Sequence, residues 1–308
     1  MKDFRPIVFV FDTNAHSYIA DSSDFENIIS KLKAQSQPLI PHLTFINFFE
    51  YLKMVKDDVS LKEAQNYVKK LKRITLGGSL LPLAKLHVQS VVGAVSREEL
   101  KTDVKVLLRN MNTLLRISSF EEFQTIVTPS LEADLKRISD IVAGYEDMKM
   151  LTEEVLKEYR NQKKVNDFKR WLSGKAQKEY LEMFVQRAIA RFDLTLSQFN
   201  NDIKLLFEKL PSVRYVIFVF LHYVRQLVLN KRKPKTSDYN DLELVPYLNV
   251  ADYIVTRDNF LRDLINDCGE DDLKGRAISC EEFVDKLDKN MFVHRAPNSC
   301  LRLNVDLD

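Results

Sequence analysis

Two apolar segments that lie far apart in the sequence each run into an aspartate. Residues 7–11 are Ile-Val-Phe-Val-Phe and precede Asp12, and residues 253–256 are Tyr-Ile-Val-Thr and come shortly before Asp258. Short, continuous apolar runs rich in Val, Ile and Phe are typical of central strands in a parallel sheet. Ligands of open α/β sheets bind beyond the carboxyl ends of such strands, so both aspartates stand where a hard cation could be held. Either aspartate could equally cap the helix that follows it.

Three further candidate acids, on two expected helices, lie between these segments in the sequence. A helix is expected over residues 45–52, after a second short strand, and Glu50 is the lone acid in it. A later helix is expected to carry Asp238 and Asp241 in its first turns, with Asp241 at the border of the buried face. Acidic residues near a helix N-terminus are favourable with or without a metal, so these two positions also have a purely structural explanation.

In this order, Asp12, Glu50, Asp241 and Asp258 resemble the four acidic positions of PIN-domain nucleases. The resemblance covers roughly residues 5 to 75 and 236 to 290. It implies an α/β fold, a PIN-like parallel sheet flanked by helices, built from residues 1–90 and 236–308. Residues 91–235 would then be a long all-helical insertion, which separates the second and third acids far more than is usual in the family. Pro246 also departs from the pattern, because it should kink the helix that carries Asp241.

The resemblance implies a role for each acid. Asp12 would be a bridging metal ligand, Asp241 and Asp258 further ligands, and Glu50 a ligand or a base that orients water. Asn14 and Thr256 resemble supporting polar positions of the family, and Asp238 is a weaker candidate for the acidic pocket. Like charges raise one another's pKa, so converging carboxylates need a counter-charge. Mg²⁺ or Mn²⁺ would supply it, generate a hydroxide nucleophile and stabilise the phosphate in the transition state.

The function that this resemblance implies is a metal-dependent endonuclease that hydrolyses phosphodiester bonds. RNA is the expected substrate because it is the commoner substrate of the family, and toxin members of the family are accompanied by an inhibitor protein. One alternative is a catalytically idle PIN-like scaffold that binds nucleic acid or a protein partner. Another is a structure-specific DNA nuclease, since the flap-endonuclease relatives also carry helical insertions, although their larger set of acids is not evident here.

Charge is divided unevenly along the chain. The 308 residues contain 46 Lys or Arg and 44 Asp or Glu, a net charge of +2, but residues 96–235 alone carry +7 and the rest −5. A basic segment beside an acidic metal site would fit a surface that binds phosphates. The alternative is a solvated helix face. Two basic clusters are therefore candidates for nucleic-acid binding: Lys163, Lys164, Lys169 and Arg170, and Lys231, Arg232, Lys233 and Lys235.

Composition is compatible with a cytoplasmic enzyme. The three cysteines, Cys268, Cys280 and Cys300, form no closely spaced pair, so neither a disulfide framework nor a zinc motif is expected. The most apolar long stretch, residues 213–229, contains Arg214, His222 and Arg225 and is expected to be a buried helix rather than a membrane span. No membrane association is expected.

Overall fold

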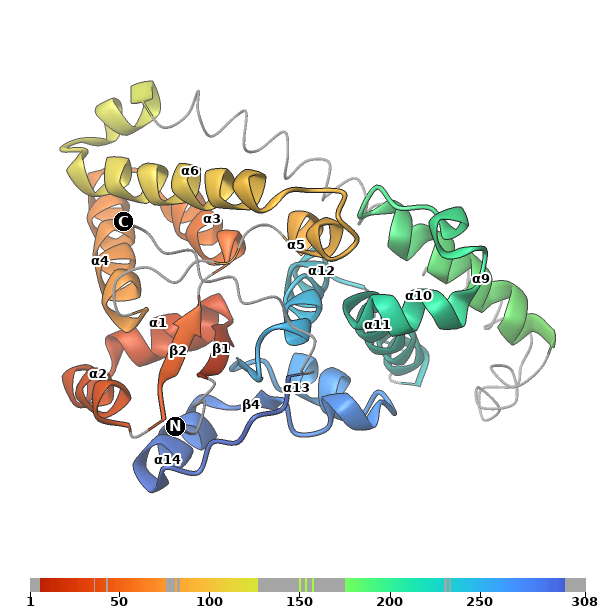
Figure 1. Ribbon diagram of the computed structural model, residues 1–308. Coiled ribbons are helices and arrows are strands. Elements are labelled where there is room, and N and C mark those ends of the chain that lie inside the picture. The colour runs from red at the N-terminus through yellow and green to blue at the C-terminus, as the bar shows by residue number, and fades with distance from the viewer. Residues whose placement is uncertain are drawn as a thin grey trace.

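The computed structural model describes most of the chain (Figure 1). The described residues are 6–35, 37–42, 44–75, 81, 84–126, 150, 153, 157, 175–229, 232 and 234–296. The fold is α/β, with a parallel sheet flanked by helices, as expected from the sequence.

Four parallel strands form the sheet in the order β2-β1-β3-β4. Their bounds are β1 (Ile7–Phe11), β2 (Leu39–His42), β3 (Tyr253–Val255) and β4 (Ala277–Ile278). The chain continues from β1 toward one edge and from β3 toward the other, so the topological switch point lies between these two central strands. The register pairs Phe11 with Val255. The next residues, Asp12 and Thr256, therefore lie side by side at the carboxyl edge, where ligands of such sheets bind.

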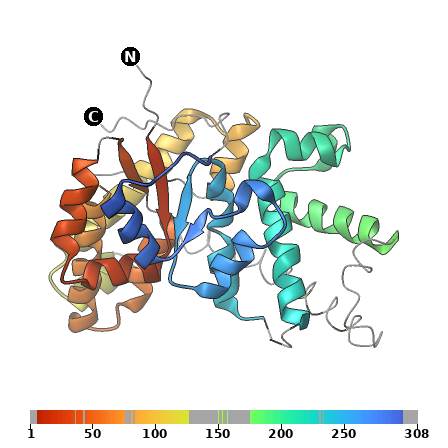
Figure 2. The ribbon, with the colours of Figure 1, turned by 90° about the horizontal axis from the view of Figure 1, so that it is seen from below.

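Helices cover both faces of the sheet (Figure 2). On one face, Phe9 and Phe11 pack edge-to-face against Phe283, with ring centroids 5.4 and 5.2 Å apart. That face is covered by α1 (Thr13–Asp21), α2 (Phe25–Ala34) and α14 (Cys280–Lys289). The other face is covered by α11 (Pro211–Leu229), α12 (Thr236–Leu242), the 3₁₀ helix η3 (Val245–Asn249) and α13 (Asn259–Asn266).

The remaining helices form two further apolar clusters. One joins α3 (Phe45–Met54), α4 (Asp58–Ile74) and α6 (Arg97–Arg116). The second joins α5 (Ala84–Val91), α9 (Lys175–Ala190), η2 (Leu196–Phe199) and α10 (Ile203–Lys209) to α11. A short 3₁₀ helix, η4 (Asp271–Leu273), precedes β4. Figure 1 shows α9, α10 and α11 together at the side of the molecule opposite α2 and α4.

The described elements between residues 97 and 229 are all helices. The last of them, α11, belongs by sequence to the expected insertion, yet its buried residues share one apolar cluster with Val10, Ile254 and Ala277 of the sheet. Its aromatic residues Tyr215, Phe220 and Tyr223 are buried there, as core residues should be. The division of the chain into core and insertion stays a prediction, but any insertion of these bounds would contribute a helix to the core of the sheet.

Local sequence signals explain several helix boundaries. Ser96 caps α6 through a capping box, in which its hydroxyl accepts from the Glu99 amide (3.2 Å) and the Glu99 carboxylate accepts from the Ser96 amide (2.7 Å). Helix α12 ends at Leu242, before Pro246, which lies in η3. The expected kink is therefore wrong, because the helix that carries Asp241 ends four residues before the proline and Pro246 stands near the start of the next helical turn. None of the described helices is long and apolar enough to cross a membrane.

Candidate functional site

Asp12 stands at the start of α1, directly after the central strand β1. Its carboxylate caps α1 by accepting from the Asn14 amide (3.2 Å), and its other oxygen accepts from the Thr256 hydroxyl (2.8 Å). The residue is 4% exposed. Burial raises the pKa of Asp12, and the nearby Asp258 raises it further, while the two hydrogen bonds lower it. Asp12 is therefore a helix cap and, at the same time, a buried carboxylate at the switch point.

Asp258 follows the neighbouring strand and caps α13. Its Oδ1 accepts from the amides of Phe260 (2.6 Å) and Leu261 (3.2 Å), and its own amide donates to the Thr256 hydroxyl (2.9 Å). Among the described residues, none donates a hydrogen bond to its Oδ2. That oxygen is available to a ligand at the edge of the sheet.

Glu50 reaches this edge from α3. It is half-buried, and its carboxylate is hydrogen-bonded by the Thr13 hydroxyl. The Asn47 amide group donates both to that hydroxyl (3.1 Å) and to the Phe11 carbonyl (2.9 Å), which ties α3 to the end of β1. Burial raises the pKa of Glu50, and the charge of Asp12 raises it further.

Asp241 brings the four acids into one electrostatic group. Its pKa is raised to about 8, first by burial and then by Asp12, Asp258, Glu50 and Asp238 in that order. The described residues donate no hydrogen bond to its carboxylate. A half-buried carboxylate without donors, among other acids, favours either a bound proton or a nearby cation.

The four acids fit a hard divalent cation by ligand type, since all offer carboxylate oxygens. The acceptor oxygens of Asp241 and Asp258 that receive no hydrogen bond from a described residue add to this fit. Within the part of the chain that the structure describes, however, no group of three or more His, Cys, Asp or Glu side chains is arranged so that it could hold a metal ion. The acids are thus electrostatic neighbours without being a closed set of ligands.

The three supporting residues, Thr256, Asn14 and Asp238, differ in their burial and in their contacts with the acids. Thr256 is 1% exposed and bridges the two strand-end acids. Asn14 is exposed and contributes its backbone amide to Asp12. Asp238 is 5% exposed, and three donors occupy both of its oxygens, so packing alone accounts for its place: the Tyr223 hydroxyl (3.0 Å), Arg232 Nη2 (2.5 Å) and the Lys235 amide (3.0 Å).

Few of the basic candidates lie in the described part of the chain. Lys163, Lys164, Lys169, Arg170, Lys231 and Lys233 lie outside it. Arg232 points inward, because it forms an ion pair with Asp238 and its guanidinium lies 4.1 Å from the centre of the Phe260 ring. Its side chain is only 27% exposed, which disfavours the expected contact with nucleic acid. Lys235 is exposed and stands just before α12.

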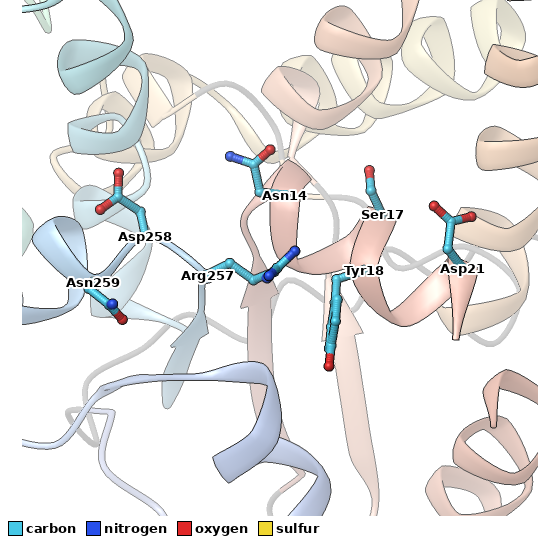
Figure 3. A pocket seen from close by; sticks show the side chains of 7 residues that line it. All are labelled: Asn14, Ser17, Tyr18, Asp21, Arg257, Asp258 and Asn259. Atoms are coloured by element: carbon cyan, nitrogen blue, oxygen red, sulfur yellow. The ribbon is translucent and has the colours of Figure 1, made fainter. Parts of the chain in front are cut away.

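A pocket beside the acids involves residues that the sequence did not single out. It has a volume of about 600 Å³ and shares Asn14 and Asp258 with the acidic site (Figure 3). Its other lining residues are Ser17, Tyr18, Asp21, Arg257 and Asn259. Two signals could have found it. Positions 14, 17, 18 and 21 share one helix face by spacing, and residue 257 lies between two residues already assigned to the site.

Comparisons with known proteins give little further identification. No family model matches the chain, and no solved structure matches it. Among curated proteins, the chain is similar to the E3 ubiquitin-protein ligase BRE1 of Candida glabrata, with 22% identity over 334 aligned positions. The alignment covers 95% of this chain and 47% of that protein, so the chain spans about half the length of the curated protein it matches.

Proposed function

We propose that the protein is a divalent-metal-dependent endonuclease with a PIN-like core, which hydrolyses phosphodiester bonds, with RNA as the expected substrate. The observation that carries the proposal is the state of Asp241. Its carboxylate has no hydrogen-bond donor among the described residues, and burial together with the acids at the two strand ends and on α3 raises its pKa to about 8. Such a group gains most from a cation that the neighbouring acids can share.

The strand order supports this reading of the site. Asp12 and Asp258 follow the two central strands, which flank the switch point, and Glu50 of α3 and Asp241 of α12 are close enough to these acids to interact with their charges. The end of a parallel sheet to which separate elements deliver acids is also where ligands of such folds bind. A binding module with no chemistry would have no need for four mutually repelling carboxylates there.

The residues of this chain would prepare the site as follows. Thr256 and the Asn14 amide hold the Asp12 carboxylate in one orientation, and Thr13 holds Glu50. Asp12, Asp241 and Asp258 would hold the ion, with Glu50 as a further ligand or as the base that orients water. A bound Mg²⁺ or Mn²⁺ would lower the pKa of its water and stabilise the negative charge that develops on the phosphate.

The likeness to a ubiquitin ligase adds no second candidate function. It rests on 22% identity over an alignment that covers 47% of that protein, and no observation of the structure favours ligase activity. An idle scaffold of the same fold remains the alternative to an enzyme, and a cleavage assay separates the two.

The assay uses end-labelled single-stranded RNA, single-stranded DNA and duplexes, with Mn²⁺, Mg²⁺ or EDTA. We expect cleavage within single-stranded RNA that needs the metal. Asp12→Asn and Asp241→Asn should slow it by at least about 10²-fold, since a lost ligand removes several kcal/mol of transition-state stabilisation. Asp263→Asn is the control, because this exposed acid of α13 lies outside the site. A purified Asp12→Asn protein that cuts as fast as wild type would refute the assignment.

A further inference from the structure

The pocket beside the acids combines an exposed ring with an exposed cation. The Arg257 guanidinium lies 4.4 Å from the centre of the Tyr18 ring. Tyr18 is 42% exposed, so solvent reaches it in the pocket. Figure 3 shows Arg257 reaching from the end of β3 toward Tyr18 on α1, with Asp258 on its other side.

Arg257 is the only cation among the described residues that line this pocket. No described acid forms an ion pair with it within 4 Å, although its charge helps to lower the pKa of Glu281. It therefore retains donors for an anion. Its position next to Asp258 is significant because a polyanion approaching four carboxylates is repelled, and a cation at their border offsets that repulsion.

We propose that this pocket binds the unpaired nucleotide that adjoins the scissile phosphate. Arg257 would contact its backbone phosphate, and Tyr18 would stack on its base. Ser17, Asn14 and Asn259 would offer hydrogen bonds to the sugar or the base edge. An unpaired base is required, because only a base released from a duplex presents its face to a side chain. The link to the scissile phosphate rests on the proposed nuclease function, whereas binding of the nucleotide does not.

Binding is tested with a labelled short single-stranded RNA in the full chain carrying Asp12→Asn, so that cleavage cannot consume the probe. Fluorescence anisotropy should show that Arg257→Gln and Tyr18→Leu each weaken binding by about tenfold, because stacking and phosphate contacts are each of that order. Arg257→Gln should also reduce the slope of log affinity against log salt by about 0.7. Both residues are exposed, so neither change should disturb the fold.

Two matched variants distinguish contacts made in the pocket from a general change in side-chain size or in net charge. Tyr18→Phe keeps the ring and should bind as the parent does, and Arg262→Gln removes a charge from nearby α13 without altering a lining residue. Wild-type affinity in both Arg257→Gln and Tyr18→Leu would overturn the proposal, as would equal affinity for the duplex form of the probe. Weaker binding by these two variants in a protein that never cleaves would uphold the pocket and reject the nuclease. If the wild-type protein cleaves RNA and neither change affects cleavage, the nuclease function is upheld and the nucleotide pocket is rejected.

Discussion

One hydroxyl group joins the two acids that end the central strands. Thr256 donates to the Asp12 carboxylate and accepts from the Asp258 amide. A hydroxyl has a single proton, so donation to Asp12 fixes its direction and leaves its lone pair for the amide. Thr256 is thus the residue that sets the orientation of Asp12 relative to α13.

Replacing Thr256 by valine keeps the volume and removes both hydrogen bonds. We expect the protein to lose about 1–3 kcal/mol of unfolding free energy, because a buried carboxylate and an amide lose their partner. Affinity for Mn²⁺ should fall about 10–100-fold, as is typical when a partner that orients a ligand is removed. Denaturant unfolding and Mn²⁺ titration measure these effects. Thr256→Ser should retain most of the unfolding free energy and most of the Mn²⁺ affinity. Equal values for the valine and serine variants would show that the hydroxyl does not orient Asp12.

The raised pKa of Asp241 predicts how stability depends on pH. The ordinary value is 3.8 and the folded value is about 8, so between these values the folded state holds more protons than the unfolded state. Unfolding free energy must then fall as pH rises from about 4 to about 8. In EDTA, the melting temperature should be higher at pH 5 than at pH 8.

Asp241→Asn should reduce this pH dependence, because the titrating carboxyl is gone. It should also raise the unfolding free energy at pH 8 by an amount on the order of 2 kcal/mol, because it removes the repulsion between Asp241 and the neighbouring acids. Calorimetry at both pH values measures the difference. Asp263→Asn should leave the profile unchanged, since that acid is exposed. An Asp241→Asn protein with the wild-type profile would contradict the electrostatic coupling on which the site is built.

At the scale of elements, a buried ion pair connects the helical region to the segment that follows the acid-bearing helix. The Arg191 guanidinium, just after α9, contacts the Glu243 carboxylate, just after α12. Their side chains are 10% and 7% exposed. The two charges join elements that are distant in sequence, and Glu243 lies two residues after Asp241. The position of α12 at the site therefore depends in part on α9.

Breaking this pair from one side should be costly. Arg191→Met would leave the buried Glu243 carboxyl without its cationic partner, so we expect a loss of up to about 3–5 kcal/mol in unfolding free energy above pH 8. The loss should be smaller at lower pH, because burial raises the pKa of Glu243 to about 8 and the carboxyl can then bind a proton. Combining it with Glu243→Gln should recover a large part of the loss, because no charge then remains. A double-mutant cycle by denaturant unfolding measures the coupling. Additive effects of the two changes would show that the contact does not stabilise the fold.

The two central strands and the position of Asp12 and Asp258 beyond their ends were predictable, because both depend on local patterns. Apolar runs marked β1 and β3, and parallel pairing of neighbouring strands places the residues after them at one edge. The role of Arg232 was not predictable from its place in a basic cluster. Its ion pair with Asp238, six residues on, depends on how the chain turns into α12. Likewise, the contact between Tyr18 and Arg257 depends on how α1 lies beside the end of β3.

At the scale of the whole molecule, basic residues of the middle region should steer a polyanion toward the acids. If Lys163, Lys164, Lys169 and Arg170 contact phosphates, changing all four to glutamine should reduce the salt slope of single-strand binding by up to about three units. Turnover at saturating substrate should change little. The control removes four exposed lysines outside residues 91–235: Lys33, Lys56, Lys62 and Lys69. If both quadruple variants bind alike, the middle region is not the nucleic-acid surface.

The central claim is that the four carboxylates bind a divalent ion together, and calorimetric titration of Mn²⁺ into the purified protein tests it most directly. The titration is done at pH 7 in two buffers of different ionisation enthalpy, so that proton release can be measured. Wild type and Asp263→Asn should bind the ion and release protons. The reason is that Asp241, with a pKa of about 8, must give up its proton to become a ligand. Asp12→Asn should bind at least about tenfold more weakly, since one charged ligand is gone. Identical Mn²⁺ binding by wild type and Asp12→Asn, or no binding by wild type at millimolar Mn²⁺, would contradict the account.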